Sequence, residues 1–290
     1  MNIKKINDFI NAKKTIEFTH LHPTFYCQTS SFYNGYLKKY LGNDINVKLQ
    51  KIVNIHNAFY KYNPYQLFEI NNSFIFQSSW KYCRNLEEFS FDKLYLRAGK
   101  ETARLHIFFD KYFTNACMYP TIYNMNFFQQ IIELIELMSD CNIVSRSTVN
   151  KLSESIFRAL RNLQQKNIGG VHGDIHTNNF VTDGENVYLI DFDMVGYGNR
   201  LFDFSVFFFS IYQRISFFAL YIEGYLSQKK IKFSWQEFKQ VCLLTRVLCI
   251  CSNLNKHSNY KWLPSYIENT INFVDSMSST PPSIIRNFFY

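Results

Sequence analysis

The segment from residue 171 to residue 193, VHGDIHTNNFVTDGENVYLIDFD, combines carboxylate, amide and imidazole side chains at short spacing. Asp174 is followed five residues later by Asn179 and seventeen residues later by Asp191. The apolar runs within the segment are typical of two short strands, and an Asp-Gly pair between them favours a tight turn. A hairpin of this kind would hold the three polar side chains near one another at its strand ends.

This set of side chains suits phosphoryl transfer, which depends on positioning and charge stabilisation more than on covalent chemistry by the protein. One carboxylate would accept the proton of the attacking hydroxyl group or orient that group. The amide oxygen and the second carboxylate would hold Mg²⁺, a hard cation that prefers oxygen ligands. The segment therefore predicts a site for a metal ion and a triphosphate at the floor of a cleft.

The sequence HGDIHTNN followed by LIDFD resembles the catalytic loop and metal segment of the aminoglycoside/choline phosphotransferase family, small-molecule kinases built on the protein-kinase-like fold. AGKETARLH and GYGNRLFDFSVFF are similar to the same family, so the resemblance covers residues 98–106 and 171–208. The remainder matches only by the order of its elements. The resemblance implies a kinase that uses ATP (or GTP) and Mg²⁺ to phosphorylate a hydroxyl group.

Carried over residue by residue, the resemblance assigns Asp174 as the catalytic base and Asn179 and Asp191 as Mg²⁺ ligands. His172 would brace the loop, and His176 would do the same or contact the substrate. A second metal and a substrate contact are both open as roles for Asp193, which stands where protein kinases have the glycine of D-F-G. Asp203 is expected to cap a helix or to hydrogen-bond the loop rather than to catalyse. His106 is expected to pack against the catalytic lobe.

The first part of the chain supplies candidates for nucleotide binding. GYLKKYL contains Lys38 and Lys39, which on a strand face opposite sides, so only one can reach the phosphates. The order of residues in the family favours Lys38. QTSSF resembles the serine-containing phosphate loops of the family, which makes Ser30 and Ser31 the expected contacts in the absence of a G-x-G-x-x-G sequence.

The helix that should follow these strands departs from the family. A kinase-like site pairs its lysine with an acid on that helix, yet residues 45–63 contain neither Asp nor Glu. Gln50 occupies about the expected place and offers only a neutral hydrogen bond. Residues 73–80, SFIFQSSW, fit the interlobe hinge, whose backbone would meet the adenine.

The predicted elements give the fold class. Strands are expected within 24–41 and 66–77, and the helical spacing of apolar residues predicts helices at 92–112, 122–139 and 147–165. After Asp203 the pattern is helical throughout. We therefore expect an α+β, two-lobed protein-kinase-like fold, with a small β-rich nucleotide-binding lobe at 1–78 and a larger, mostly helical catalytic and substrate-binding lobe at 79–290.

The composition argues against several classes of protein and of binding site. The net charge is +8 and the pI about 9.0, but the basic residues are spread along the chain, which disfavours a nucleic-acid partner. The seven cysteines include no C-x-x-C pair, so neither a disulfide framework nor a zinc site is indicated, as in a cytoplasmic protein. The most apolar stretch is interrupted by Gln213 and Arg214, so no membrane span is expected.

The acceptor stays open at this point. Residues 201–290 contain nine Lys or Arg and five Asp or Glu, which disfavours a polycationic aminoglycoside. A choline-like alcohol, a sugar, an amino acid, a nucleoside and an antibiotic alcohol all stay open as small-molecule substrates. Two alternatives follow from the missing helix acid and from the fold: a pseudokinase-like protein that binds nucleotide or a partner without transfer, and a peptide or protein kinase. The oligomeric state is not indicated.

Overall fold

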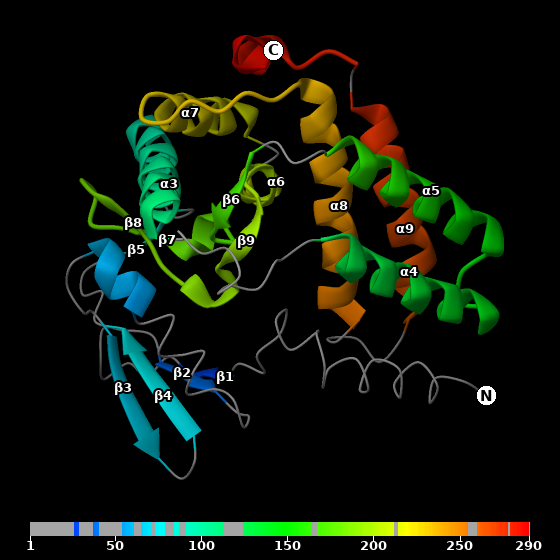
Figure 1. Cartoon of the computed structure of the whole chain (residues 1–290), viewed down its shortest axis with the longest axis horizontal. Helices are drawn as coiled ribbons and strands as arrows, with labels where there is room; N and C mark the ends of the chain where they lie inside the picture. The colour runs from blue at the N-terminus through cyan, green and yellow to red at the C-terminus, as the bar shows by residue number, and fades with distance from the viewer. Residues whose placement is uncertain are drawn as a thin grey trace.

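The computed structural model of the chain contains one larger sheet, two small sheets and a set of packed helices (Figure 1). The residues it describes are 26–28, 37–40, 54–60, 65–70, 73–78, 84–86, 91–112, 124–163, 167–211, 214–254, 260–277 and 279–289. All statements below concern these residues.

The larger sheet is antiparallel and has the strand order β1-β2-β4-β3. Its strands are β1 (Tyr26–Gln28), β2 (Leu37–Tyr40), β3 (Tyr65–Ile70) and β4 (Ser73–Ser78). The strands expected within 24–41 and 66–77 are thereby confirmed. Most of the positions expected to form the helix within 45–63 lie outside the described residues, and 54–60 are described as helical.

Helix α3 (Asp92–Tyr112) has the bounds expected from the sequence, and it packs closely along α7 (Ile215–Leu226). A glycine on each helix permits this approach. A Cβ atom on Gly99 would lie 1.9 Å from the backbone oxygen of Tyr221, and one on Gly224 would lie 1.9 Å from that of Leu96. Because neither position has room for a side chain, the two backbones can pass in contact.

Two small antiparallel sheets carry the polar segment. The first pairs β6 (Ile168–Val171) with β9 (Gly196–Asn199); the second has the order β5-β7-β8, with β5 (Arg84–Asn85), β7 (Phe180–Thr182) and β8 (Val187–Leu189). The predicted Asp-Gly turn is confirmed, since Gly184 has a positive φ of 95° and Asp183 Oδ1 accepts the backbone N–H groups of Glu185 and Asn186. The sequence did not predict β5 and β9, because two residues and a Gly-Tyr-Gly-Asn run show no strand periodicity.

The helices after β9 are α6 (Leu201–Ser210), α7, α8 (Trp235–Leu254) and α9 (Leu263–Ser276). Of these, α8 and α9 pack on α5 (Arg146–Asn162), which pairs with α4 (Met125–Asp140), and Figure 1 shows α4 and α5 beside α8 and α9. Asn124 and Ser145 begin α4 and α5 by accepting a backbone N–H with their side chains. The two predicted helices, expected at 122–139 and 147–165, are confirmed with small shifts at their ends.

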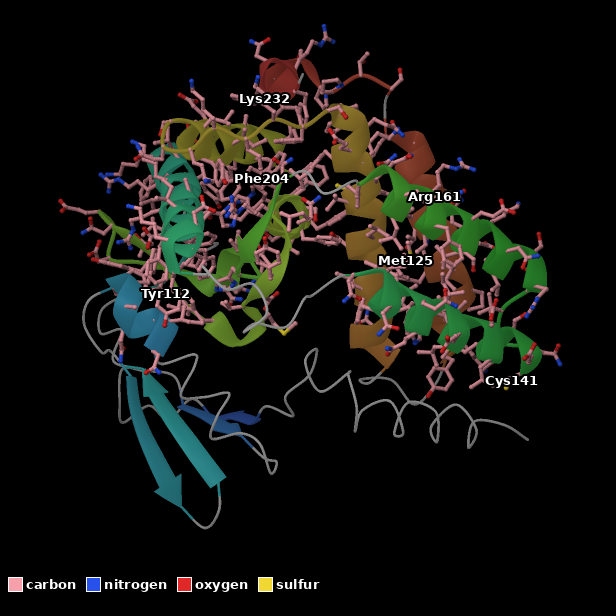
Figure 2. All side chains as sticks on the ribbon, viewed as in Figure 1. Tyr112, Met125, Cys141, Arg161, Phe204 and Lys232 are labelled. Atoms are coloured by element: carbon pink, nitrogen blue, oxygen red, sulfur yellow. The ribbon has the colours of Figure 1, made fainter. Side chains whose placement is uncertain are left out.

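Aromatic rings fill the core between α6 and α7. Phe204, labelled in Figure 2, packs edge-on against Tyr221 and Tyr225, and Phe207 stacks on Tyr221 with 3.9 Å between ring centroids. All four side chains are buried. Some of the thirty Phe and twenty Tyr of this chain therefore fill the hydrophobic core. Within the described part of the chain, no helix is both long and apolar enough to cross a membrane.

Candidate active site

The loop of residues 172–179, here called the Asp174 loop, leaves β6 and ends in the short 3-10 helix η4 (Thr177–Asn179). Gly173 has a φ of 84°, a conformation that glycine adopts without strain and that turns the chain just before Asp174. The Asn179 amide nitrogen donates to the backbone oxygen of Asp174 at 2.8 Å and to its carboxylate Oδ2 at 3.1 Å. The amide oxygen of Asn179 accepts nothing from the described residues, so it is available to a cation.

His176 also contacts the Asp174 carboxylate. Its Nδ1 accepts the backbone N–H of Asn178 at 3.2 Å, so the proton of a neutral ring lies on Nε2, which is 3.5 Å from Asp174 Oδ2. Burial alone would raise the pKa of Asp174, but the bond and charge of His176, the charge of His172 and the bond from Asn179 together hold that pKa below its ordinary value. The side chain is 41% exposed, so an ionised carboxylate faces solvent at neutral pH.

Asp191 is fixed through the residue before it. The Ile190 N–H donates to the backbone oxygen of Asn179 at 2.8 Å, and His172 Nε2 donates to the Ile190 oxygen at 3.0 Å. Asp191 itself has left-handed backbone angles, with φ 67° and ψ 63°. This conformation is costly for a residue other than glycine, and such residues cluster at functional sites. The structure thus joins Asp174 and Asn179 directly and places Asp191 one residue after Ile190, whose backbone is bonded to Asn179.

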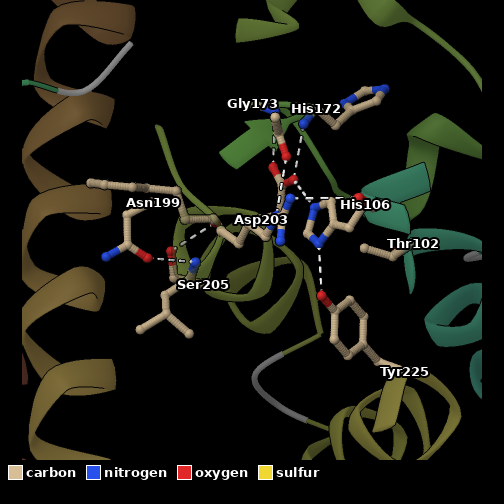
Figure 3. Close-up of polar contacts among 12 residues, drawn as sticks. Thr102, His106, His172, Gly173, Asn199, Asp203, Ser205 and Tyr225 are labelled. Carbon is tan, nitrogen blue, oxygen red and sulfur yellow. Dashed lines mark hydrogen bonds and ion pairs between the residues drawn. The ribbon is translucent and has the colours of Figure 1, made fainter. Parts of the chain in front are cut away.

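A buried carboxylate anchors the start of the Asp174 loop from α6. Asp203 accepts the backbone N–H of His172 at 2.9 Å and that of Gly173 at 2.8 Å, and its Oδ2 lies 2.9 Å from His106 Nε2 (Figure 3). On the other side of the imidazole, Nδ1 is 2.9 Å from the Tyr225 hydroxyl. Burial lowers the pKa of His106 in spite of Asp203, so the ring is neutral, donating to the carboxylate and accepting from the tyrosine.

Three expectations are confirmed in this region. Asp203 hydrogen-bonds the loop, which was one of the two roles expected for it. His106 is buried beside the Asp174 loop, to which it is linked through Asp203. His172 braces the loop against the segment that leads to Asp191, as expected.

The candidates for nucleotide binding are only partly described. Lys38 and Lys39 lie on β2, where their positions are opposite Cys27 and Tyr26 on β1. The structure shows that both lysines lie on a strand, but it does not indicate which of them would reach the phosphates. Ser30 and Ser31 lie outside the described residues, and so does Gln50.

Tyr60 is a site residue that the sequence did not reveal. Its hydroxyl accepts the backbone N–H of Leu189 at 2.7 Å and lies 2.7 Å from Glu101 Oε1, to which it can donate. Glu101 is bound from its other side by Arg104. Tyr60 therefore ties the helical residues 54–60 to β8, two residues before Asp191. A single tyrosine among twenty carries no sequence signal for such a role.

The oxygen atoms at the site fit a magnesium ion that arrives with a nucleotide. Mg²⁺ is usually held by one or two side chains together with phosphate oxygens and water. Asn179 Oδ1 and the Asp191 carboxylate offer hard oxygen donors of the kind and number that such an ion would need. In the described ranges no three His, Cys, Asp or Glu side chains converge, so nothing there resembles a cage for a resident metal.

The family follows from a comparison with family models, in which that of the phosphotransferase enzyme family matches residues 92–240. The chain belongs to this family. The matched region contains α3, the Asp174 loop and the Asp203 network, and the prediction of a kinase is confirmed. A comparison with curated protein sequences finds no match for this phosphotransferase.

Solved structures similar to this phosphotransferase are small-molecule kinases. A choline/ethanolamine kinase family protein from Mesorhizobium loti is 13% identical, with a TM-score of 0.61 and 97% of each chain covered. The amicoumacin kinase hAmiN, in complex with AMP-PNP, Ca²⁺ and Ami, is 12% identical, with a TM-score of 0.61 and coverage of 94% and 96%. A microcompartment-associated aminopropanol kinase is 13% identical, with a TM-score of 0.59 and coverage of 88% and 89%. The likeness confirms an α+β fold of the protein-kinase-like kind.

Proposed function

We propose that this phosphotransferase moves the γ-phosphoryl group of ATP or GTP to a hydroxyl group of a small molecule, with Asp174 as the catalytic base. The observation that carries the proposal is the state of the Asp174 carboxylate. It is ionised at neutral pH, half-exposed, and oriented by Asn179 and His176. A carboxylate held in this way can bind an acceptor hydroxyl group and take its proton.

The site residues have separate roles in this reaction. Asp174 orients the acceptor hydroxyl group and receives its proton as that oxygen bonds to the γ-phosphorus and the bond from phosphorus to the departing nucleotide breaks. Since the pKa of Asp174 is lowered, its main contribution is orientation, with proton transfer late in the reaction. Asn179 and Asp191 would hold Mg²⁺, which neutralises charge on the phosphates. His176 Nε2 keeps the carboxylate turned toward the acceptor.

The nucleotide would lie between two lobes, residues 1–78 and 79–290. Lys38 on β2 would contact the α and β phosphates, and Ser30 and Ser31 would contribute the phosphate loop. Support comes from the antiparallel sheet on which Lys38 lies and from the amicoumacin kinase of the same fold, which was solved with the nucleotide analogue AMP-PNP.

The acceptor class is supported by the compounds on which the similar proteins act. Choline or ethanolamine and aminopropanol are small alcohols. We therefore propose a small-molecule alcohol as acceptor. The pseudokinase-like alternative gains no support from the site, because Asp174, Asn179 and Asp191 are all present in a connected arrangement. The peptide-kinase alternative gains none from the similar proteins, which are small-molecule kinases.

Transfer of labelled γ-phosphate from Mg-ATP to a panel of small alcohols tests the proposal, with Asp174→Asn as the informative variant. We expect turnover to fall by about 10²- to 10⁴-fold, with the dissociation constant of the nucleotide changed little. Asp140→Asn is the matched control, since this carboxylate is 70% exposed and makes only a surface pair with Arg146. Full turnover in Asp174→Asn would reject Asp174 as the base.

A further inference from the structure

The aromatic ring of Phe192, the residue directly after Asp191, is buried in contact with two histidines. Its centroid is 5.1 Å from that of His172 and 5.2 Å from that of His56, and both contacts are edge-on. Each of the three residues is at most 1% exposed. Edge-on packing at such distances stabilises aromatic pairs beyond the burial of their apolar area. We call these three residues the Phe192 cluster.

The helical residues 54–60 supply much of the surroundings of the Phe192 ring. His56 belongs to them, and so do Phe59 and Tyr60, whose ring centroids are 6.1 Å and 6.5 Å from that of Phe192. A helix that is distant in sequence therefore packs against the side chain that directly follows the proposed metal ligand.

Asp191 is held through both of its neighbours in sequence. Before it, the Ile190 oxygen accepts a hydrogen bond from His172 Nε2 at 3.0 Å, and after it, the Phe192 ring packs against the same imidazole. Asp191 has left-handed backbone angles, which a residue other than glycine adopts at a cost. Because such a conformation persists only where its surroundings fix it, the contacts of Ile190 and Phe192 contribute to holding Asp191 in it.

The ring contacts join the helix to the site where the kinase pattern has an ion pair. In that pattern an acid on the helix pairs with a lysine on a strand, and residues 45–63 contain neither Asp nor Glu. Packing forces act over a short range, and a gap of about 0.5–1 Å already removes a quarter to a half of the attraction between two groups. A small displacement of His56 would therefore loosen the hold on Phe192.

We propose that His56 is a positioning residue for the metal site. Through its ring contact with Phe192, it keeps Asp191 in the left-handed conformation and thereby supports the binding of the Mg²⁺ that accompanies the nucleotide. The inference rests on the proposed function, because it takes Asp191 as a ligand of that ion. It assigns to His56 neither a contact with the nucleotide or the acceptor nor a proton transfer.

The magnesium dependence of nucleotide binding tests this role. AMP-PNP is titrated into the full chain by calorimetry, once with Mg²⁺ and once with EDTA, and the ratio of the two dissociation constants measures the contribution of the ion. His56→Leu keeps an apolar side chain and removes the ring. We expect it to lower the ratio about 10-fold, a factor of the size that the strain of a left-handed residue implies, and to change the dissociation constant in EDTA little.

Three further variants separate positioning from general stability. His56→Phe returns an aromatic ring and should restore the wild-type ratio, whereas Phe192→Leu removes the other ring of the contact and should lower the ratio as His56→Leu does. Phe238→Leu is the matched control, since this fully buried ring packs against rings of α6 and α7 and against Phe289. It should lower the melting temperature and leave the ratio unchanged.

Three results would overturn the inference: an unchanged ratio in His56→Leu, a ratio in His56→Phe as low as in His56→Leu, or an equal loss in Phe238→Leu. The failure of the proposed function is separate, because the titrations need no acceptor. It would appear as absent phosphoryl transfer in the wild-type chain, even with the magnesium dependence and its loss in His56→Leu intact.

Discussion

Asp203 shows how one side chain can set the start of a functional loop. It is fully buried and accepts two consecutive backbone N–H groups, from His172 and Gly173, as well as the imidazole of His106 (Figure 3). A buried carboxylate without partners would be costly. With these three donors it stabilises a sharp turn and directs the chain to Asp174.

At this scale we predict the effect of Asp203→Asn. An amide offers one acceptor atom in place of two, and its nitrogen would face donors, so hydrogen bonds to the loop or to His106 must be lost. We expect the free energy of unfolding to fall by about 2–4 kcal/mol, from bonds to a charged group worth about 1.5–3 kcal/mol each. Urea unfolding measures the change, with Asp140→Asn as the surface control. An equally stable Asp203→Asn protein would contradict the anchoring role.

At the scale of elements, the helical residues 54–60 are attached to the rest of the protein in an unexpected way. The kinase pattern predicts an acid on this helix that pairs with a lysine on a strand, and residues 45–63 contain none. Tyr60 instead binds β8 through the backbone of Leu189 and binds α3 through Glu101. Arg104 of α3 lies over the rings of Phe59 and Tyr60 and completes the contact. The position of the helix is thus coupled to the strand that leads to Asp191.

Tyr60→Phe tests this coupling. The substitution leaves the Leu189 N–H and Glu101 without the tyrosine oxygen, which should cost about 1–3 kcal/mol of stability and lower kcat through displacement of β8. Tyr221→Phe is the matched control, since that buried hydroxyl donates only to Thr102, between α7 and α3. We expect urea unfolding to show a loss in both variants and steady-state kinetics to show a lower kcat in Tyr60→Phe alone. Equal kcat values would mean that the contact is structural only.

At the scale of the whole molecule, local patterns predicted the local elements, whereas several contacts between distant residues were missed. Helix 92–112 and the strand pairs were predictable because apolar spacing is a local signal. Asp174, Asn179 and Asp191 could be proposed from the sequence because they lie within one short segment. The contacts of Tyr60 could not, since they join it to Glu101 and Leu189, which are 41 and 129 positions away in sequence. Sequence spacing carries no information of that kind for a single chain.

Acid sensitivity is a property of the whole fold that follows from its buried histidines. His56, His106 and His172 have no exposed surface, and burial lowers the pKa of each. For His56 the shift is from 6.5 to about 3. The unfolded chain therefore binds a proton below pH 6.5 that the folded protein does not accept until about pH 3. It follows that the stability contributed by keeping His56 neutral is fully present above pH 6.5 and is lost as the pH falls from there toward 3.

His56→Phe isolates one of these groups. Phenylalanine keeps the ring contacts that His56 makes with Tyr60 and Phe192 and removes the titration. Between pH 7 and pH 5 His56 alone should cost the wild-type protein about 2 kcal/mol, so the variant should lose that much less on acidification. Urea unfolding of both proteins at pH 7, 6 and 5 measures the difference, in which the titrations of all other groups cancel. Parallel stability curves would show that His56 binds its proton equally in the folded and unfolded states, and the helix at 54–60 would then not exclude water from this side chain.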